Sequence, residues 1–331
     1  MMATLPFAMS SVLRRRLTID IVVFLALVSF GLACSSYNRY TLVIAGTYAL
    51  VTLGNNLLLG HLGIMSIGHA GFFAAGSYSF AYLVDKGVSM PVAIAIATVF
   101  AGFLGFLLSV PALRLKGHFF SLVTLGFSAA VGEIIISMPG ITGGSNGLAV
   151  KTGLMSEHTL FLVVAALVGL VLLSQEMLLA TRVGATLHLV RDSEVAARSL
   201  GVNIVRWRAY VFVYSGALAG LGGSFFAIAI GFLAPESFDV FLSIYFLVAV
   251  VIGGMRRPLG AVIGAGVIVE IPQQTLSTPG YSPAILGIAL LLAVFVLVWR
   301  PSIPTLGLTH VKRAARRNAE IATDRAIGDV K

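Results

Sequence analysis

The stretch RDSEVAARSLGVNIVRWR, residues 191–208, is followed directly by the apolar run AYVFVYSGALAGLGGSFFAIAIGF, residues 209–232. The first part is charged and polar. The second is long enough to cross the hydrocarbon core of a bilayer, which takes about 20 residues of helix. Apolar runs of similar length recur along the chain with basic residues between them, and this pattern predicts a membrane protein with several transmembrane helices.

The composition supports a membrane protein. Of the 331 residues, 58% are hydrophobic and 11% are charged, whereas a soluble domain carries about 25% charged residues. The net charge of +9 does not indicate nucleic-acid binding, because the basic residues separate apolar runs and do not cluster with aromatic residues. Cys34 is the single cysteine, and HExxH and CxxC spacings do not occur, so we expect neither a disulfide framework nor a metal site.

The N-terminus has the features of an export signal. Three arginines at 14–16 precede an apolar run that ends in GLAC at 31–34, the form of a lipoprotein cleavage site. The apolar run at 17–36 is, however, long enough to span a bilayer, and many further apolar runs follow it. We therefore predict that it is an uncleaved first transmembrane helix.

Ten segments have the length and apolar character of membrane-crossing helices. The ninth is the weakest, because Pro272 leaves only 259–271 uninterrupted, and about 1.5 Å per residue makes that run too short to cross unaided. A broken or re-entrant helix remains open there. The ten segments are 17–36, 40–60, 63–84, 90–113, 118–137, 158–180, 207–232, 238–255, 259–276 and 281–299.

Basic residues test this count, because Lys and Arg in short loops stay on the cytoplasmic side. With ten crossings and a cytoplasmic N-terminus, nineteen of the 22 basic residues lie inside, and only Arg39, Lys86 and Lys151 lie outside. Removing the ninth crossing would place the basic tail from Arg300 onward outside. We therefore expect ten crossings with both termini cytoplasmic. The predicted parts are a cytoplasmic tail (1–16), a transmembrane domain (17–300) with a large cytoplasmic loop (181–208), and a basic cytoplasmic tail (301–331).

The loop at 181–208 is predicted to contain a short helix of about two turns. Asp192 or Ser193 is a good N-cap, and Glu194 favours the positive end of the helix dipole. Gly201 supplies a left-handed stop. These signals predict a helix over residues 192–200.

Two interpretations of this short helix stay open. In the first, Val195, Leu200, Val202 and Trp207 face the bilayer, so that the helix lies in the lipid interface. In the second, the helix is a docking element for a cytoplasmic partner protein.

The stretch EVAARSLG at 194–201 resembles the EAA loop of ABC importer permeases, which those proteins press into a groove of the ATP-hydrolysing subunit. The spacing from the glutamate to the glycine is seven residues, one longer than in the general pattern, so contacts known from other importer classes do not transfer directly. The whole order of landmarks resembles the branched-chain amino-acid permease family, specifically the longer of its two paired membrane subunits. The further stretches that carry this resemblance are GIMSIGHAGFF (63–73), LRLKGHFFSLVTL (113–125), ITGGSNGL (141–148) and GGMRRPLG (253–260).

The resemblance implies a permease subunit in the bacterial inner membrane that imports small amino acids, most directly branched-chain ones. Relatives by pattern serve urea or other small polar solutes. The implied partners are a second permease subunit in a heterodimer, cytoplasmic subunits that bind ATP and Mg, and an extracytoplasmic substrate-binding protein. The residues implied in coupling to the ATPase are Asp192, Ser193, Glu194, Ala196, Ala197, Arg198, Leu200 and Gly201.

Small residues recur three and four apart in two segments, Gly216–Ser224 and Gly260–Gly266. In lipid, where no hydrophobic force drives helices together, such spacing lets helix backbones approach closely. We expect a tight helix bundle, with most of these glycines serving packing.

Among the ionisable residues within predicted spans, three are candidates for the substrate path: His69, Glu133 and Glu270. A charge inside a bilayer is costly, so such groups face protein or water. Each is either a hydrogen-bonded partner between helices or part of the substrate path, and both readings remain open.

Several functions are disfavoured by what the sequence lacks. There is no GxxxxGK[ST] loop and no soluble stretch of about 100 residues, so ATP hydrolysis is expected on another chain. An ion-coupled carrier would use Glu133 with Glu270, but the chain shows no convincing internal repeat. A membrane enzyme would need clustered polar residues in adjacent spans, and none is predicted, so we expect no enzymatic activity and no cofactor on this chain.

Overall fold

Helices make up almost all of the structure, a computed structural model that describes residues 11–112, 118–150, 155–274 and 287–288. The chain divides into two units, Met1–Leu290 and Leu291–Lys331, and all described residues lie in the first. The tail at 301–331, most of the predicted tenth segment and the first ten residues fall outside the described ranges. The elements are α1 (Ser11–Ala33), α2 (Ser36–Asn56) with the π-helix η1 (Leu57–Leu62), α3 (His69–Asp85), α4 (Met90–Ala112), α5 (His118–Ser137), α6 (Pro139–Thr142), η2 (Gly144–Asn146), β1 (Leu148–Ala149), α7 (Glu157–Leu179), α8 (Arg182–Asp192), α9 (Glu194–Ser199), α10 (Ile204–Ile230), β2 (Phe232–Leu233), η3 (Pro235–Phe238), α11 (Val240–Gly253) and α12 (Pro258–Gln274).

The predicted helical membrane architecture is confirmed in its class. Five helices in the described part of the chain are long and apolar enough to span a bilayer: α2 continued through η1, α4, α5, α7 and α10. Three shorter apolar helices, at Leu17–Ala33, Val240–Gly253 and Pro258–Glu270, accompany them. These eight helices correspond to predicted segments other than the third and the tenth.

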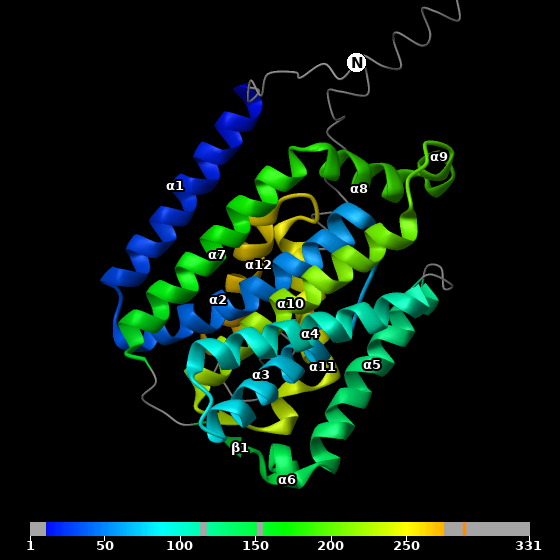
Figure 1. The fold of residues 1–331 in the computed structure, drawn as a ribbon. Helices are drawn as coiled ribbons and strands as arrows, with labels where there is room; N and C mark the ends of the chain where they lie inside the picture. Colours follow the sequence, from blue (N-terminus) through cyan, green and yellow to red (C-terminus); the bar gives the residue numbers. More distant parts are fainter. Residues whose placement is uncertain (1–10, 113–117, 151–154, 275–286, 289–331) are drawn as a thin grey trace, which may run out of the picture. The chain divides into compact units, whose positions relative to one another are not determined.

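Helices α2 and α10 form the centre of the bundle. In each of them 72% of the most apolar window is buried, against 39% in α4, 33% in α7 and 28% in α5. Helix α10 packs against α2, α3 and α4, and Figure 1 shows the outer helices α1 and α5 on opposite sides of this centre. The outer helices therefore present apolar side chains such as Val99 and Leu170 outward, as lipid-facing helices do.

Glycines on α10 bring it close to its neighbours. A Cβ atom at Gly216 would lie 2.7 Å from the carbonyl oxygen of Ala101 in α4, and one at Gly222 would lie 2.6 Å from that of Thr47 in α2. Side-chain carbons do not approach this closely, so only glycine fits at these crossings. The tight packing predicted from the small-residue run is confirmed for α10.

The third predicted segment, 63–84, is wrong at its start. Residues 63–68 are not helical, and α3 begins only at His69. Gly63 takes a left-handed conformation with φ of 74°, which ends η1. Hydropathy placed the whole segment in a helix because residues 63–68 are mostly small or apolar, but the Met65 carbonyl and the Ile67 amide bond to side chains of α5.

The ninth segment shows no break in the described residues. Helix α12 runs from Pro258 to Gln274 and contains Pro272 in its final turn. A proline this close to the end of a helix interrupts few hydrogen bonds beyond it. Residues 275–286 lie outside the described ranges, so the choice between a full crossing and a re-entrant helix stays a prediction.

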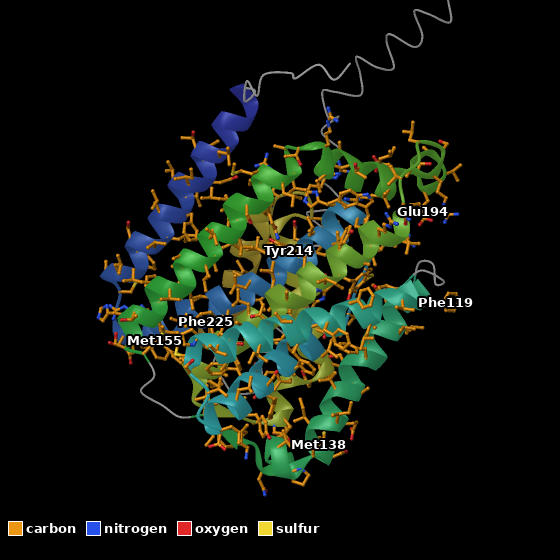
Figure 2. The ribbon with its side chains drawn as sticks, viewed as in Figure 1. Phe119, Met138, Met155, Glu194, Tyr214 and Phe225 are labelled. Carbon is orange, nitrogen blue, oxygen red and sulfur yellow. The ribbon has the colours of Figure 1, made fainter. Side chains whose placement is uncertain are left out.

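Two loops meet at one end of the bundle in a short ladder that the sequence did not predict. Strands β1 and β2 pair antiparallel, with Leu148 opposite Leu233, and the Val150 amide donates to the Gly231 carbonyl at 2.9 Å. Figure 2 places Met138 at this end and Glu194 at the opposite end. The ladder and helix α9 thus mark opposite ends of the bundle.

Candidate functional site

The loop predicted at 181–208 contains two helices, α8 and α9, where the sequence predicted one. Thr181 caps the start of helix α8, and its hydroxyl accepts from the Val183 amide at 3.2 Å. Its apolar face, with Leu187 and Val190, is buried in the main core. Spacing of apolar residues at 183, 187 and 190 was the signal that would have found this helix.

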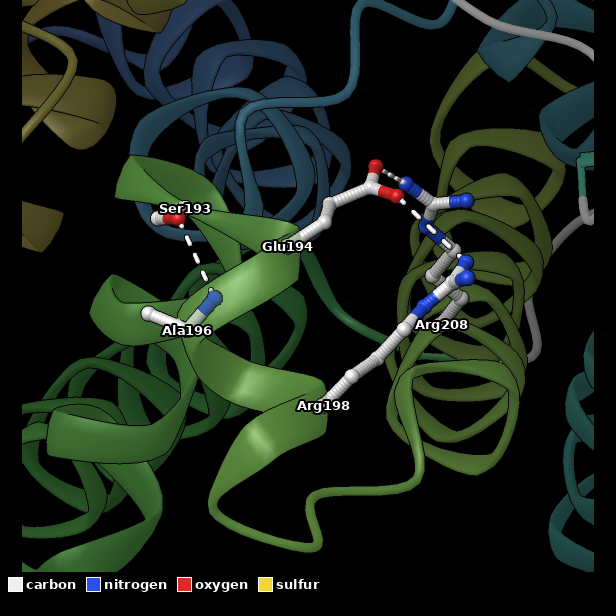
Figure 3. A network of polar contacts seen from close by, with 5 residues as sticks. All are labelled: Ser193, Glu194, Ala196, Arg198 and Arg208. Carbon is white, nitrogen blue, oxygen red and sulfur yellow. Dashed lines mark hydrogen bonds and ion pairs between the residues drawn. The ribbon is translucent and has the colours of Figure 1, made fainter.

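Ser193 caps helix α9. It lies in extended conformation, and its hydroxyl accepts from the Ala196 amide at 3.2 Å (Figure 3). Asp192 is instead the last residue of α8. Of the two predicted caps Ser193 is correct, and the predicted start at 192 is wrong because α8 occupies that residue.

The end of α9 follows the predicted stop. Gly201 has φ of +75°, and its amide donates to the Arg198 carbonyl at 2.9 Å. The next amide, of Val202, donates to the Ala197 carbonyl at 3.0 Å, which completes a glycine-based helix end. Leu200 is the C-cap, so the helix is shorter than the predicted 192–200.

Glu194 ties α9 to the start of α10. Its carboxylate forms an ion pair with Arg208 and lies 3.8 Å from the Arg198 guanidinium, one turn further along α9 (Figure 3). The Arg208 side chain is 13% exposed, so this pair is largely screened from water. Sequence reasoning missed Arg208, because no local pattern connects residues 14 apart across a turn.

The exposed surface of α9 carries apolar and cationic side chains. Val195 is 80% exposed and Leu200 72%, and the Arg198 side chain is 70% exposed. Ala197, between them in sequence, is fully buried against the core. This small helix is therefore held from one side and presents its other side to a neighbour.

The structure separates the four residues of the predicted lipid-facing stripe. Val202 and Trp207 pack against the main core, whereas Val195 and Leu200 project from α9. An interfacial helix needs these side chains on one continuous face. Their separation argues against the lipid-lying interpretation of this loop.

Helix α8 is attached to η1 beneath it. The Arg191 guanidinium donates to the Gly60 carbonyl, and the His188 ring lies edge-on to the His61 ring with centroids 5.1 Å apart. Burial lowers the pKa of His188; the charge of Asp192 opposes this shift, and the charges of Arg191 and Arg256 lower the pKa further. This junction favours a neutral imidazole on α8.

The three residues considered for a substrate path do not meet. His69 is fully buried in the bundle, with its Nε2 2.7 Å from the Ser215 hydroxyl. Glu133 lies on the exposed side of α5, and Glu270 lines an apolar groove of about 480 Å³ between α1, α2, α7 and α12. The geometry supports a packing role for His69. In the described ranges, no three His, Cys, Asp or Glu side chains are grouped as a metal site.

Comparison with known families agrees with this geometry. The family model of the branched-chain amino acid transport system permease component matches residues 39–299, which include every long helix from α2 to α12. The chain belongs to this family.

Two curated relatives are permease proteins of different transport systems. The permease protein LivM of the high-affinity branched-chain amino acid transport system of Escherichia coli K12 is 33% identical over 285 residues, which are 77% of this chain and 66% of LivM. The chain thus spans slightly less than two thirds of that relative's length. The autoinducer 2 import system permease protein LsrC of Escherichia coli SMS-3-5 is 30% identical over 65% of each chain.

A solved structure shares the fold. An ABC transporter of the metal-chelate type, in an inward-facing conformation, aligns with a TM-score of 0.50 over 87% of this chain and 100% of its own, at 16% identity. At this identity the similarity supports the helical permease fold and carries no information about the substrate.

Proposed function

We propose that this chain is a membrane-spanning permease subunit of a bacterial ABC importer, and that it translocates branched-chain amino acids with ATP hydrolysed by separate subunits. In this proposal the chain crosses the cytoplasmic membrane ten times, with both termini and α9 on the cytoplasmic side. The observation that carries it is α9 itself: a capped helix held firmly from one side, with Val195, Arg198 and Leu200 projecting outward.

A helix of this kind suits a protein groove. Apolar side chains that project from a short rigid helix lose little conformational entropy on docking, and the arginine gives charge specificity. The Glu194–Arg208 pair and the Ser193 cap fix the helix direction, so a push on α9 is transmitted to α8 and α10. An element that couples ATP hydrolysis to helix movement needs such rigid contacts with its neighbouring helices.

The partners follow from this assignment. ATP-binding subunits would dock on α9 and carry ATP and Mg, a second permease subunit would complete a heterodimer, and a substrate-binding protein would deliver the amino acid at the β1–β2 end. Branched-chain amino acids are favoured over urea or another small polar solute by the LivM relative. An ion-coupled carrier is less well supported, because Glu133 and Glu270 lie on different faces of the bundle.

Reconstitution tests this function. The chain is co-expressed with its neighbouring ATPase, second permease and binding-protein genes, and the purified complex is placed in vesicles. Uptake of labelled leucine should require ATP and the binding protein. Uptake that an ion gradient drives without ATP would contradict the proposal.

A further inference from the structure

Residues 63–68 form a non-helical connector between η1 and α3, which is buried at Ser66 and Gly68 and exposed at Gly63 and Met65. Backbone groups at membrane depth need partners from the protein, because lipid offers none. The Ile67 amide donates to the Thr124 hydroxyl at 2.9 Å, and the Met65 carbonyl accepts from the Ser121 hydroxyl at 2.9 Å. Both partners lie on α5, so the connector is clamped to that helix.

The two hydroxyl groups that bond the connector belong to a row of buried hydroxyl groups along α5. Ser121, Thr124 and Ser128 are buried and lie three and four residues apart, on one face of the helix. Ser128 continues the row to Ser243 of α11 at 3.3 Å, and Ser243 accepts from the Ala70 amide at the start of α3. The opposite face of α5 is mostly exposed, so this row is a main attachment of α5 to the bundle.

The other end of the connector is held by the α8–α9 unit. Arg191 donates to the Gly60 carbonyl in η1, and a Cβ atom on Gly63 would lie 2.8 Å from the Arg191 side chain, so the two are in contact. Helix α8 passes directly into α9 through Ser193. The element that Arg191 contacts, η1, is a π-helix, a form that is frequent at functional sites.

We infer that residues 60–68 transmit displacement of α9 to α5, with Arg191 at one end and Ser121 and Thr124 at the other as positioning residues. The inference rests on the proposed function, since it is the docked ATPase that would displace α9. A shift of α8 moves the Gly60 carbonyl through Arg191. The short connector passes this shift to its two side-chain bonds on α5, which is free to move on its exposed side.

The first test removes one hydrogen bond between the connector and α5 without changing the size of the side chain. Thr124→Val leaves the Ile67 amide without its acceptor, and Thr124→Ser keeps the hydroxyl. In the reconstituted complex, Thr124→Val should lower the amount of substrate imported per ATP hydrolysed about fivefold, which corresponds to one buried hydrogen bond of about 1 kcal/mol. Thr124→Ser should retain the wild-type ratio.

A matched control lies on the same helix. Ser137→Ala removes a hydroxyl that bonds only the Glu133 carbonyl of its own helix at 2.7 Å, and it should leave the ratio unchanged. Complex yield should be similar for all three variants. An unchanged ratio in Thr124→Val, or an equal loss in Ser137→Ala, would overturn the inference.

A distance measurement separates this inference from the proposed function. Spin labels at the exposed positions Ile134 on α5 and Leu170 on α7 should report an ATP-dependent change of distance in the complex. Arg191→Met and Thr124→Val should both reduce the change. If the wild-type complex shows the distance change without importing amino acids, the inferred transmission through residues 60–68 stands and the substrate assignment fails. If either variant keeps the wild-type distance change, the inferred transmission through residues 60–68 is wrong.

Discussion

Gly220 is one of the glycines of α10 that leave no room for a larger side chain. A Cβ atom there would overlap the Ala101 side chain and lie 3.1 Å from the Ala97 carbonyl oxygen of α4. Gly220→Leu should therefore destabilise the protein by about 1–3 kcal/mol through overpacking, read as a lower melting temperature in detergent. Gly132→Leu on α5 is the matched control, because no atom lies within 4 Å of its Cβ position. Equal melting temperatures for the two variants would show that α4 and α10 do not pack as described.

Glu194 is the residue that most directly sets the orientation of α9. Glu194→Lys places a cation beside Arg198 and Arg208 and opposes the helix dipole by about 0.3–1 kcal/mol. We expect faster hydrogen exchange across α9 and weaker ATP-driven uptake, with normal insertion. Glu157→Lys, at the start of α7, makes the same dipole change at an exposed helix start and should preserve uptake. Loss of uptake in both variants would point to a general charge effect.

The junction of α8 with η1 predicts a dependence on pH at the level of elements. The lowered pKa of His188 means that the folded junction binds its proton less readily than the unfolded chain does. The stability of the junction is therefore full above about pH 6.5, the usual value for histidine, and falls as the pH drops below it. Hydrogen exchange of α8 should accelerate in mild acid. His188→Gln should weaken that acceleration, and an identical pH response in both proteins would refute the role of His188.

Elements whose hydrogen bonds are local were predictable from the sequence, and those that depend on distant partners were not. Ser193, Glu194 and Gly201 act within one or two helical turns, so the short helix of the loop at 181–208 and its end could be predicted. The break at residues 63–68 depends on Ser121 and Thr124, more than 50 residues away, and hydropathy contains no such information. The Glu194–Arg208 pair was missed for a similar reason, because it forms only when α9 folds back on α10.

For the candidate residues of the substrate path, prediction from the sequence was limited in the same way. The sequence marked His69, Glu133 and Glu270 as ionisable groups within apolar runs, which is a property of each residue alone. Whether they meet depends on helix packing, and the structure places them in three separate surroundings.

For the whole molecule, the proposed topology predicts which residues each side of the membrane can reach. In a Cys34→Ser background, single cysteines at Asp85 and Ser145, both exposed, should react with an impermeant reagent added outside intact cells. A cysteine at Ser199 should react only after the membrane is opened. Ser145 is preferable to its neighbour Gly144, which has a positive φ of 57°. Outside labelling at Ser199 would reverse the orientation and place α9 away from any cytoplasmic ATPase.

Docking of α9 on an ATPase is the central claim, and site-specific photo-crosslinking in the assembled importer tests it most directly. A photoreactive residue at Val195 or Leu200 should give an adduct with the ATPase subunit, because both side chains project from α9. The same group at Leu170, which is 67% exposed on α7, should give adducts with lipid only. Adducts with lipid alone at Val195 and Leu200 would contradict the account and show that α9 lies on the membrane.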